Sequence, residues 1–158
     1  MVLDTSALLA ILFREEGYED LLEEIRRAHP RKVAAPTLAE AGIVLGARLG
    51  FERVYLLLAL LSELQAEVIP FSEAHAREAI SAYRRYGRGR HPAGLNFGDC
   101  LSYALAKVEG EPLLYKGEDF DRTDLAWKPS QRKPSFTPWG PRTPTAWPKR
   151  PFPPGGRT

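Results

Sequence analysis

The chain has 158 residues, which is enough for one domain with a substantial core and too few for two ordinary domains. All 20 Asp and Glu residues lie in residues 1–126 with 15 Lys and Arg, whereas residues 127–158 carry seven Lys and Arg and no acid. The net charge of +2 therefore combines an acidic segment with a strongly basic one. Cys100 is the one cysteine, which excludes an intramolecular disulfide and fits a reducing compartment.

Two further features bear on location. The longest apolar run, Tyr55–Leu61, is too short to cross a bilayer. The sequence opens on an apolar strand pattern and not on a signal peptide. We therefore expect a soluble, cytoplasmic protein with no membrane partner.

Apolar runs and amphipathic segments alternate along residues 1–126. Strands are predicted at 1–4, 32–35, 67–70 and 112–115, and helices at 5–13, 19–28, 37–49, 52–65, 72–86 and 96–108. This alternation favours an α/β sandwich with a mostly parallel sheet.

Residues 127–158 lack this pattern. They contain nine of the 14 prolines, several of them three residues apart, which is the period of polyproline II. We predict that a globular domain ends near residue 126 and that 127–158 form a disordered, basic, Pro-rich tail. A ligand for an SH3-type domain is a weaker alternative.

Four acids stand where predicted strands give way to helices or loops: Asp4, Glu40, Asp99 and Asp119. An open parallel sheet gathers its carboxyl strand ends along one edge, where ligands bind. Two like charges about 4 Å apart repel by about 1 kcal/mol in water and about 4 kcal/mol at a dielectric constant of 20. A divalent cation removes that cost, and all-oxygen ligands favour Mg²⁺ or Mn²⁺ over zinc.

Helix capping is the alternative explanation for each acid. Thr37 and Glu40 fit a capping box, Asn96 and Asp99 fit one less well, and Asp4 could cap the first helix. However, Asp4 ends a buried strand, and a buried carboxylate without partners is costly. The coincidence of four such positions in one acidic domain favours a shared site.

Several motifs resemble the PIN-domain ribonucleases, specifically the VapC-type toxins of bacterial or archaeal toxin–antitoxin pairs. They are VLDTSALLAIL at the start, Glu40 after a Pro-Thr start, RRYGRGRHPAGLNFGDCLSYALAK, and LLYKGEDFDRTDL. The resemblance covers about residues 1–125 and implies a PIN-like three-layer sandwich. The basic tail is a departure, because the family usually ends near the TDL segment.

The resemblance also implies the site. Asp4, Glu40, Asp99 and Asp119 correspond to the family's Mg²⁺ or Mn²⁺ ligands, with Glu118 and Asp121 as neighbouring candidates for the fourth acid. Two further residues match family positions: Ser6, the small hydroxyl beside the first acid, and Asn96, which opens the helix of the third.

Four arginines crowd the segment before Asp99: Arg84, Arg85, Arg88 and Arg90. They could simply form a solvated helix end. Because arginine grips phosphate bidentately and this domain is otherwise acidic, we predict contact with RNA. The three histidines, His29, His75 and His91, are expected to be solvated or to touch substrate without a catalytic role, and Cys100 to be a core residue.

The favoured function is a metal-dependent endoribonuclease, the toxin of a type II toxin–antitoxin pair, in which a metal-activated water cleaves RNA. The alternatives are a structure-specific DNA nuclease and a non-catalytic metal- or RNA-binding module. The expected partners are RNA, a VapB-type antitoxin and a second copy of the chain. The apolar run Val54–Leu61 predicts the homodimer contact.

Overall fold

The computed structural model describes residues 1–126. The predicted disordered tail at 127–158 lies outside these residues.

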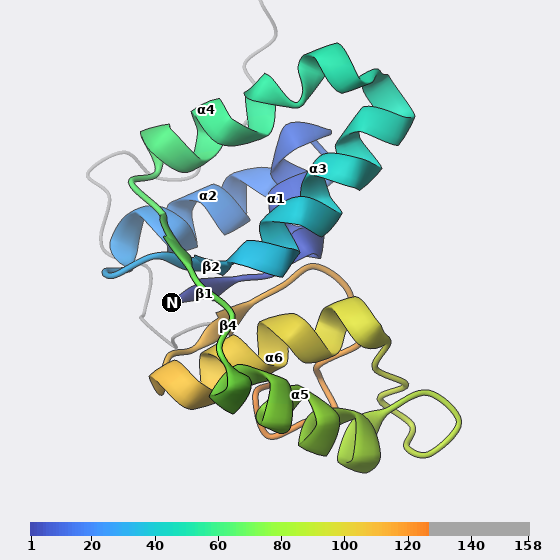
Figure 1. The fold of residues 1–158 in the computed structure, drawn as a ribbon. Coiled ribbons are helices and arrows are strands. Elements are labelled where there is room, and N and C mark those ends of the chain that lie inside the picture. Colours follow the sequence, from blue (N-terminus) through green and yellow to red (C-terminus); the bar gives the residue numbers. More distant parts are fainter. Residues whose placement is uncertain (127–158) are drawn as a thin grey trace, which may run out of the picture. The chain divides into compact units, whose positions relative to one another are not determined.

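Strands and helices alternate along the described chain, as the sequence predicts (Figure 1). The strands are β1 Val2–Leu3, β2 Lys32–Ala34, β3 Glu67–Ile69 and β4 Leu113–Leu114. The helices are α1 Thr5–Leu12, α2 Tyr18–Arg27, α3 Ala35–Leu49, α4 Tyr55–Glu63, α5 Glu73–Tyr86 and α6 Phe97–Glu109, with a 3-10 turn, η1 Phe51–Arg53, before α4. The sheet order is β3-β2-β1-β4, and every pairing is parallel.

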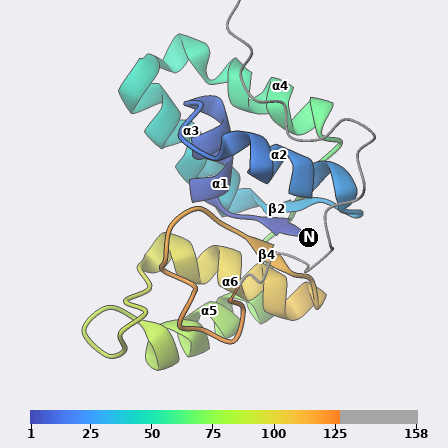
Figure 2. The same cartoon turned by 180° about the vertical axis from the view of Figure 1, so that it is seen from behind.

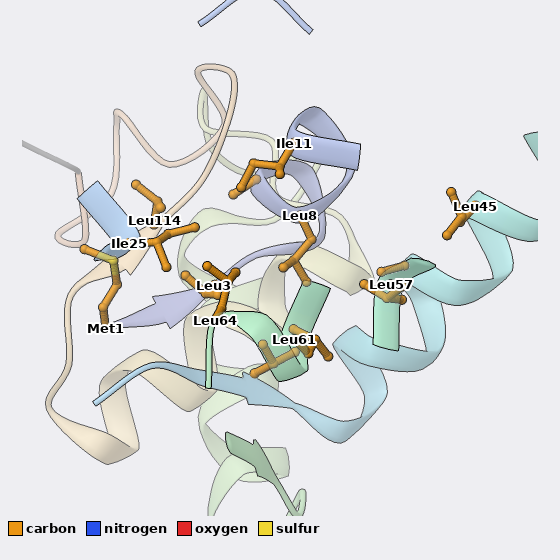
Figure 3. Close-up of a cluster of buried hydrophobic side chains, with 13 residues drawn as sticks. Met1, Leu3, Leu8, Ile11, Ile25, Leu45, Leu57, Leu61, Leu64 and Leu114 are labelled. Carbon is orange, nitrogen blue, oxygen red and sulfur yellow. The ribbon is translucent and has the colours of Figure 1, made fainter. Parts of the chain in front are cut away.

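The sheet separates two layers of helices. Figures 1 and 2 show α1 to α4 on one face and α5 and α6 on the other. Because successive strand residues point to opposite faces, Leu3 and Leu114 enter the core under α1 to α4 (Figure 3), whereas Val2 and Leu113 enter the core over α5 and α6. All four are fully buried. The predicted three-layer α/β sandwich is confirmed.

The predicted helix at 52–65 is divided into η1 and α4. Gly50 ends α3 at φ 99°, a conformation that favours glycine, and the chain then reverses. The Phe51 ring packs onto α3 at Gly46, where a Cβ atom would lie 2.5 Å from the ring. Within residues 1–126, no helix has both the length and the apolar content required to cross a membrane.

The histidines differ from one another in their surroundings. His29 is exposed, but the expectation of a solvated or substrate-contacting His75 is wrong, because its side chain is buried. It stands at the third position of α5, where Nδ1 accepts a hydrogen bond from the backbone N–H of Ser72 in a capping box. His91 packs edge-on against Tyr86, with 5.1 Å between ring centroids. Cys100 is a core residue, and burial raises the pKa of its thiol to about 11.

Candidate active site

Asp4 directly follows β1 and is almost fully buried. It is the N-cap of α1: its Oδ2 accepts hydrogen bonds from the Ser6 backbone N–H at 2.9 Å and from the Ser6 hydroxyl at 2.6 Å. The Ser6 oxygen in turn accepts a hydrogen bond from the backbone N–H of Lys116, just beyond β4, at 3.0 Å. Ser6 therefore connects the carboxyl ends of two neighbouring strands and fixes one oxygen of Asp4.

Glu40 does not belong to a capping box, so that alternative is wrong for this residue. Helix α3 begins at Ala35, which makes Thr37 the third helical residue and places Glu40 three residues further on. Pro36 explains the early start, because proline suits the first turn of a helix. Thr37 is buried, with its hydroxyl 3.2 Å from that of Ser102, whereas Glu40 Oε2 accepts a hydrogen bond from the Thr5 hydroxyl at 2.6 Å.

Asp99 lies in the first turn of α6 and makes the capping box that the sequence favoured only weakly. The Asp99 N–H donates to Asn96 Oδ1 at 3.0 Å, and the Asn96 N–H donates to Asp99 Oδ2 at 2.8 Å. Capping and a role in a site are therefore compatible at Asp4 and Asp99, since each bond occupies one carboxylate oxygen.

Electrostatics connect the four acids. Burial and, to a smaller extent, the charges of Asp4, Asp119 and Glu40 raise the pKa of Asp99 to about 6, against the hydrogen bond from Asn96. Such an effect requires the other three carboxylates to lie near Asp99. They follow β1, β2 and β4 in the chain or begin α6, so the structure gathers them at the carboxyl edge of the sheet.

The turn after β4 offers three acids, and the charge interactions with Asp99 favour Asp119 as the fourth member. Asp121 accepts a hydrogen bond from the Tyr115 hydroxyl on Oδ1 at 2.7 Å and is not among the groups that raise the pKa of Asp99. Asp119 is exposed, and its charge is among the causes of the raised pKa of Asp99. Glu118 is also exposed and is not among those causes.

The acids are near one another without forming a closed coordination shell. Among residues 1–126, no three His, Cys, Asp or Glu side chains are gathered tightly enough to hold a metal ion. Mg²⁺ keeps several water ligands when bound, so it does not require a closed shell of protein carboxylates. The donor chemistry, oxygen alone, still fits a hard divalent cation.

The arginine segment leads from the end of α5 toward Asn96, which precedes α6. Arg85 has internal partners: it donates to the Tyr86 hydroxyl at 3.0 Å and lies 3.7 Å from Asp124. The other three, Arg84, Arg88 and Arg90, are exposed, and their guanidinium groups have no ion pair or hydrogen-bond partner within the described part of the chain.

Sequence reasoning missed the part that Asp124 plays. Its carboxylate accepts hydrogen bonds from the Tyr103 hydroxyl at 2.8 Å and from Lys107 at 2.9 Å, which ties the segment after β4 to α6. These bonds outweigh the effect of burial and lower the pKa of Asp124. Asp124 lies in the LLYKGEDFDRTDL motif, but nothing local distinguishes it from its acidic neighbours.

Sequence reasoning also missed an apolar groove of about 870 Å³ beside the start of α6. Ile80 and Phe97 stand at its margin with 71% and 76% of their surface exposed. The residues that line it are Pro36, Phe71, Ala76, Ala79, Ile80, Tyr83, Arg88, Asn96, Phe97, Cys100 and Leu101. The signal in the sequence was the spacing of Ile80 and Tyr83, which places both on one side of α5.

Known proteins resemble this chain in sequence and in fold. The PIN domain family matches residues 1–125. Ribonuclease VapC30 of Mycobacterium tuberculosis is 43% identical over 126 residues, covering 80% of this chain and 96% of that protein. Ribonuclease VapC of Mycolicibacterium smegmatis is 45% identical over 126 residues, covering 80% of this chain and 98% of that protein.

Solved structures show the same fold. A chain in a toxin–antitoxin complex from Klebsiella pneumoniae matches with a TM-score of 0.61 at 16% identity, covering 80% of this chain and 95% of that one. VapC20 of M. tuberculosis, a toxin that cleaves the sarcin-ricin loop, matches with a TM-score of 0.60 at 18% identity, covering 76% and 92%. At these identities the likeness establishes the fold alone. The family match and the close relatives go further: this chain belongs to the PIN-domain family, among its VapC-type ribonucleases.

Proposed function

We propose that this protein is an endoribonuclease that depends on Mg²⁺ or Mn²⁺ and acts as the toxin of a toxin–antitoxin pair. The observation that carries the proposal is the gathering of Asp4, Glu40, Asp99 and Asp119 at one sheet edge. Within residues 1–126, none of the four forms an ion pair with a basic side chain. A cation from outside the protein would balance their charge, and relatives at 43–45% identity are named ribonucleases.

The residues around the acids orient them for such a cation. Ser6 holds Oδ2 of Asp4, and Asn96 holds Oδ2 of Asp99. The Oδ1 atom of each has no hydrogen-bond partner among the described residues and is left for an outside ligand. When bound, a divalent cation lowers the pKa of a water molecule and offsets the charge that develops on the phosphate.

RNA is the proposed substrate. Arg84, Arg88 and Arg90 are exposed. They lie at the end of α5 and in the loop that leads to α6, the helix that carries Asp99. Their guanidinium groups are free to contact phosphates, and such contacts position a strand without reading its sequence. Arg85 contributes to the same positive surface while it is held by Asp124.

Cleavage of RNA tests the proposal. Purified protein is incubated with RNA, and with single-stranded and flap DNA, in Mg²⁺, in Mn²⁺ and in a chelator. We expect cleavage of RNA that requires the cation and disappears in Asp4→Asn. Asp121→Asn is the matched control, because Asp121 is held by Tyr115 and should leave the rate unchanged. Cleavage of DNA alone would indicate a DNA nuclease. If neither RNA nor DNA is cleaved, the alternative of a non-catalytic binding module is favoured.

Two apolar surfaces suit the proposed protein partners, a second copy of the chain and an antitoxin of the VapB type. One lies on η1 and α4, where Phe51, Tyr55 and Leu58 are each more than half exposed. The other is the groove beside α6. We propose that η1 and α4 make the homodimer contact and test this by sedimentation. Leu58→Glu should yield monomers and Ile80→Glu should not; the reverse result would place the contact at the groove.

A further inference from the structure

Glu40 is held differently from Asp4 and Asp99. Asp4 and Asp99 are fixed by backbone N–H groups at the starts of their own helices. Glu40 lies further along α3 and has no such bond among the described residues. Its carboxylate is held instead by a residue of another helix, Thr5, whose hydroxyl donates to Oε2 at 2.6 Å. The orientation of Glu40 therefore depends on α1.

Thr5 is free for this task because Asp4 caps α1. The sequence predicts capping oxygens at Asp4, Thr5 and Ser6, but the Asp4 carboxylate alone accepts the hydrogen bond from the first turn. Ser6 bridges Asp4 and the backbone beyond β4, and Thr5 points its hydroxyl to Glu40. Two adjacent hydroxyls thus serve two different acids.

Gly98 faces Glu40 from the other side. A Cβ atom at position 98 would lie 2.2 Å from Glu40 Oε1 and 2.7 Å from its Oε2, far inside any normal contact. Gly98 is buried in the first turn of α6 and is not among the glycines with positive φ. Its backbone conformation is therefore open to alanine, which favours a helix more than glycine does. Glycine is required at position 98 because the Glu40 carboxylate lies where a Cβ atom would be.

We propose that Thr5 and Gly98 are positioning residues for Glu40, and that together they fix its carboxylate for the divalent cation. This inference rests on the proposed function. Thr5 holds Oε2, and the missing side chain at Gly98 lets the first turn of α6 lie against Oε1. Neither residue touches the reacting atoms, so both act through Glu40.

The test uses Thr5→Val, which keeps the shape and removes the hydroxyl, together with Thr5→Ser and Gly98→Ala. Mn²⁺ affinity is measured by calorimetry, and kcat and KM with RNA. We expect Thr5→Val, which removes the hydrogen bond that supports Glu40, and Gly98→Ala, which displaces the Glu40 carboxylate, to weaken Mn²⁺ binding by about 10-fold or more. Both should lower kcat more than they raise KM. Thr5→Ser should retain affinity within about threefold.

A double-mutant cycle separates positioning from general damage. In a Glu40→Gln background, Thr5→Val should change Mn²⁺ affinity no further, because the residue through which it acts has lost its charge. Thr37→Val is the matched control: it removes a buried hydroxyl of α3 that contacts Ser102 and not Glu40, so it should lower the unfolding temperature and leave Mn²⁺ affinity unchanged.

Three results would overturn the inference. They are wild-type Mn²⁺ affinity and kcat in Thr5→Val, an equal loss of affinity in the Glu40→Gln background, and failure of the wild-type protein to bind Mn²⁺. If Gly98→Ala fails to fold, the Thr5 cycle alone decides. A wild-type protein that binds Mn²⁺ but cleaves no RNA would refute the proposed function. The double-mutant cycle on Mn²⁺ affinity would then still test the role of Thr5.

Discussion

The two edges of the sheet carry acids in opposite situations. At the amino edge, Lys32 at the start of β2 lies 2.6 Å from Glu109 and 3.9 Å from Glu111, the two acids that precede β4. At the carboxyl edge, Asp4 and Asp99 have neighbours of the same sign and no basic partner within the described chain. Basic groups of the protein itself balance the acids at the amino edge, whereas the acids at the carboxyl edge require a cation from outside.

The pKa values follow this difference. The hydrogen bond from Lys32 lowers the pKa of Glu109, despite the opposing effect of burial, and the same bond raises the pKa of Lys32. Burial and three like charges raise the pKa of Asp99 to about 6. Acids that serve stability are thus made easier to ionise, and the acid proposed to bind a cation is made harder to ionise until that cation arrives.

The largest expected effect comes from removing an acid at the carboxyl edge. Asp99→Asn should reduce RNA cleavage by more than about a hundredfold, because even residues that merely support a metal ligand are worth 10- to 100-fold. The measurement is the single-turnover rate at saturating Mg²⁺. A rate within a few-fold of wild type would leave Asp99 with its capping role alone.

The same variant should become more stable without a cation. Because the folded-state pKa of Asp99 is about 6, its ionisation cost is absent below pH 4 and complete above pH 6. After allowance for its partial exposure, Asp99→Asn should gain about 2 kcal/mol at pH 7 in a chelator, and the gain should disappear as the pH falls toward 4. Denaturant unfolding at several pH values measures it; a gain that does not depend on pH would have another cause.

At the amino edge the corresponding change should cost stability. Lys32→Met leaves Glu109 without its ammonium partner, whereas Glu111 keeps the N-terminal ammonium of Met1. We therefore expect a loss of about 1–2 kcal/mol at pH 7 and an unchanged cleavage rate. Arg27→Met provides the comparison, since its ion pair with Glu23 is half exposed and should be worth less than about 0.5 kcal/mol. If the two variants are equally stable, the pairing at the amino edge does not support the fold.

The smallest effect is expected in the arginine segment. Arg88→Ala should reduce the slope of log affinity for RNA against log salt by about 0.7, the value for one phosphate contact on a single strand. Arg85→Ala should change this slope less and lower the unfolding temperature, because Arg85 is committed to Tyr86 and Asp124. Equal slopes in the two variants would mean that the internal contacts of Arg85 do not reduce its contribution to RNA binding.

Much of this arrangement could be predicted from local pattern. Alternating apolar runs placed every strand, and the Asp4 and Asp99 motifs identified two acids with their helix starts. The sequence predicts Glu40 as a site acid and offers a capping box with Thr37 as the alternative, which is wrong because α3 starts at Ala35, before Thr37. Local spacing indicates that a helix starts nearby and does not fix its first residue.

Contacts between distant segments could not be predicted. Lys32 and Glu109 are 77 residues apart, and Thr5 and Glu40 are 35 apart, so their pairing depends on how the layers pack. The burial of His75 likewise depends on the element packed over it, since an alanine-rich helix pattern gives no sign of which face a polar residue occupies.

The effect of a divalent cation on unfolding tests the central claim most directly. Thermal unfolding is followed in a chelator and at rising Mg²⁺ or Mn²⁺, for the wild-type protein and for Asp99→Asn. The wild-type protein should gain about 1.4 kcal/mol for each tenfold rise of the cation above its dissociation constant, and the variant should gain far less. A wild-type protein that the cation does not stabilise, or that gains no more than the variant, would contradict the proposal that these carboxylates form a cation site.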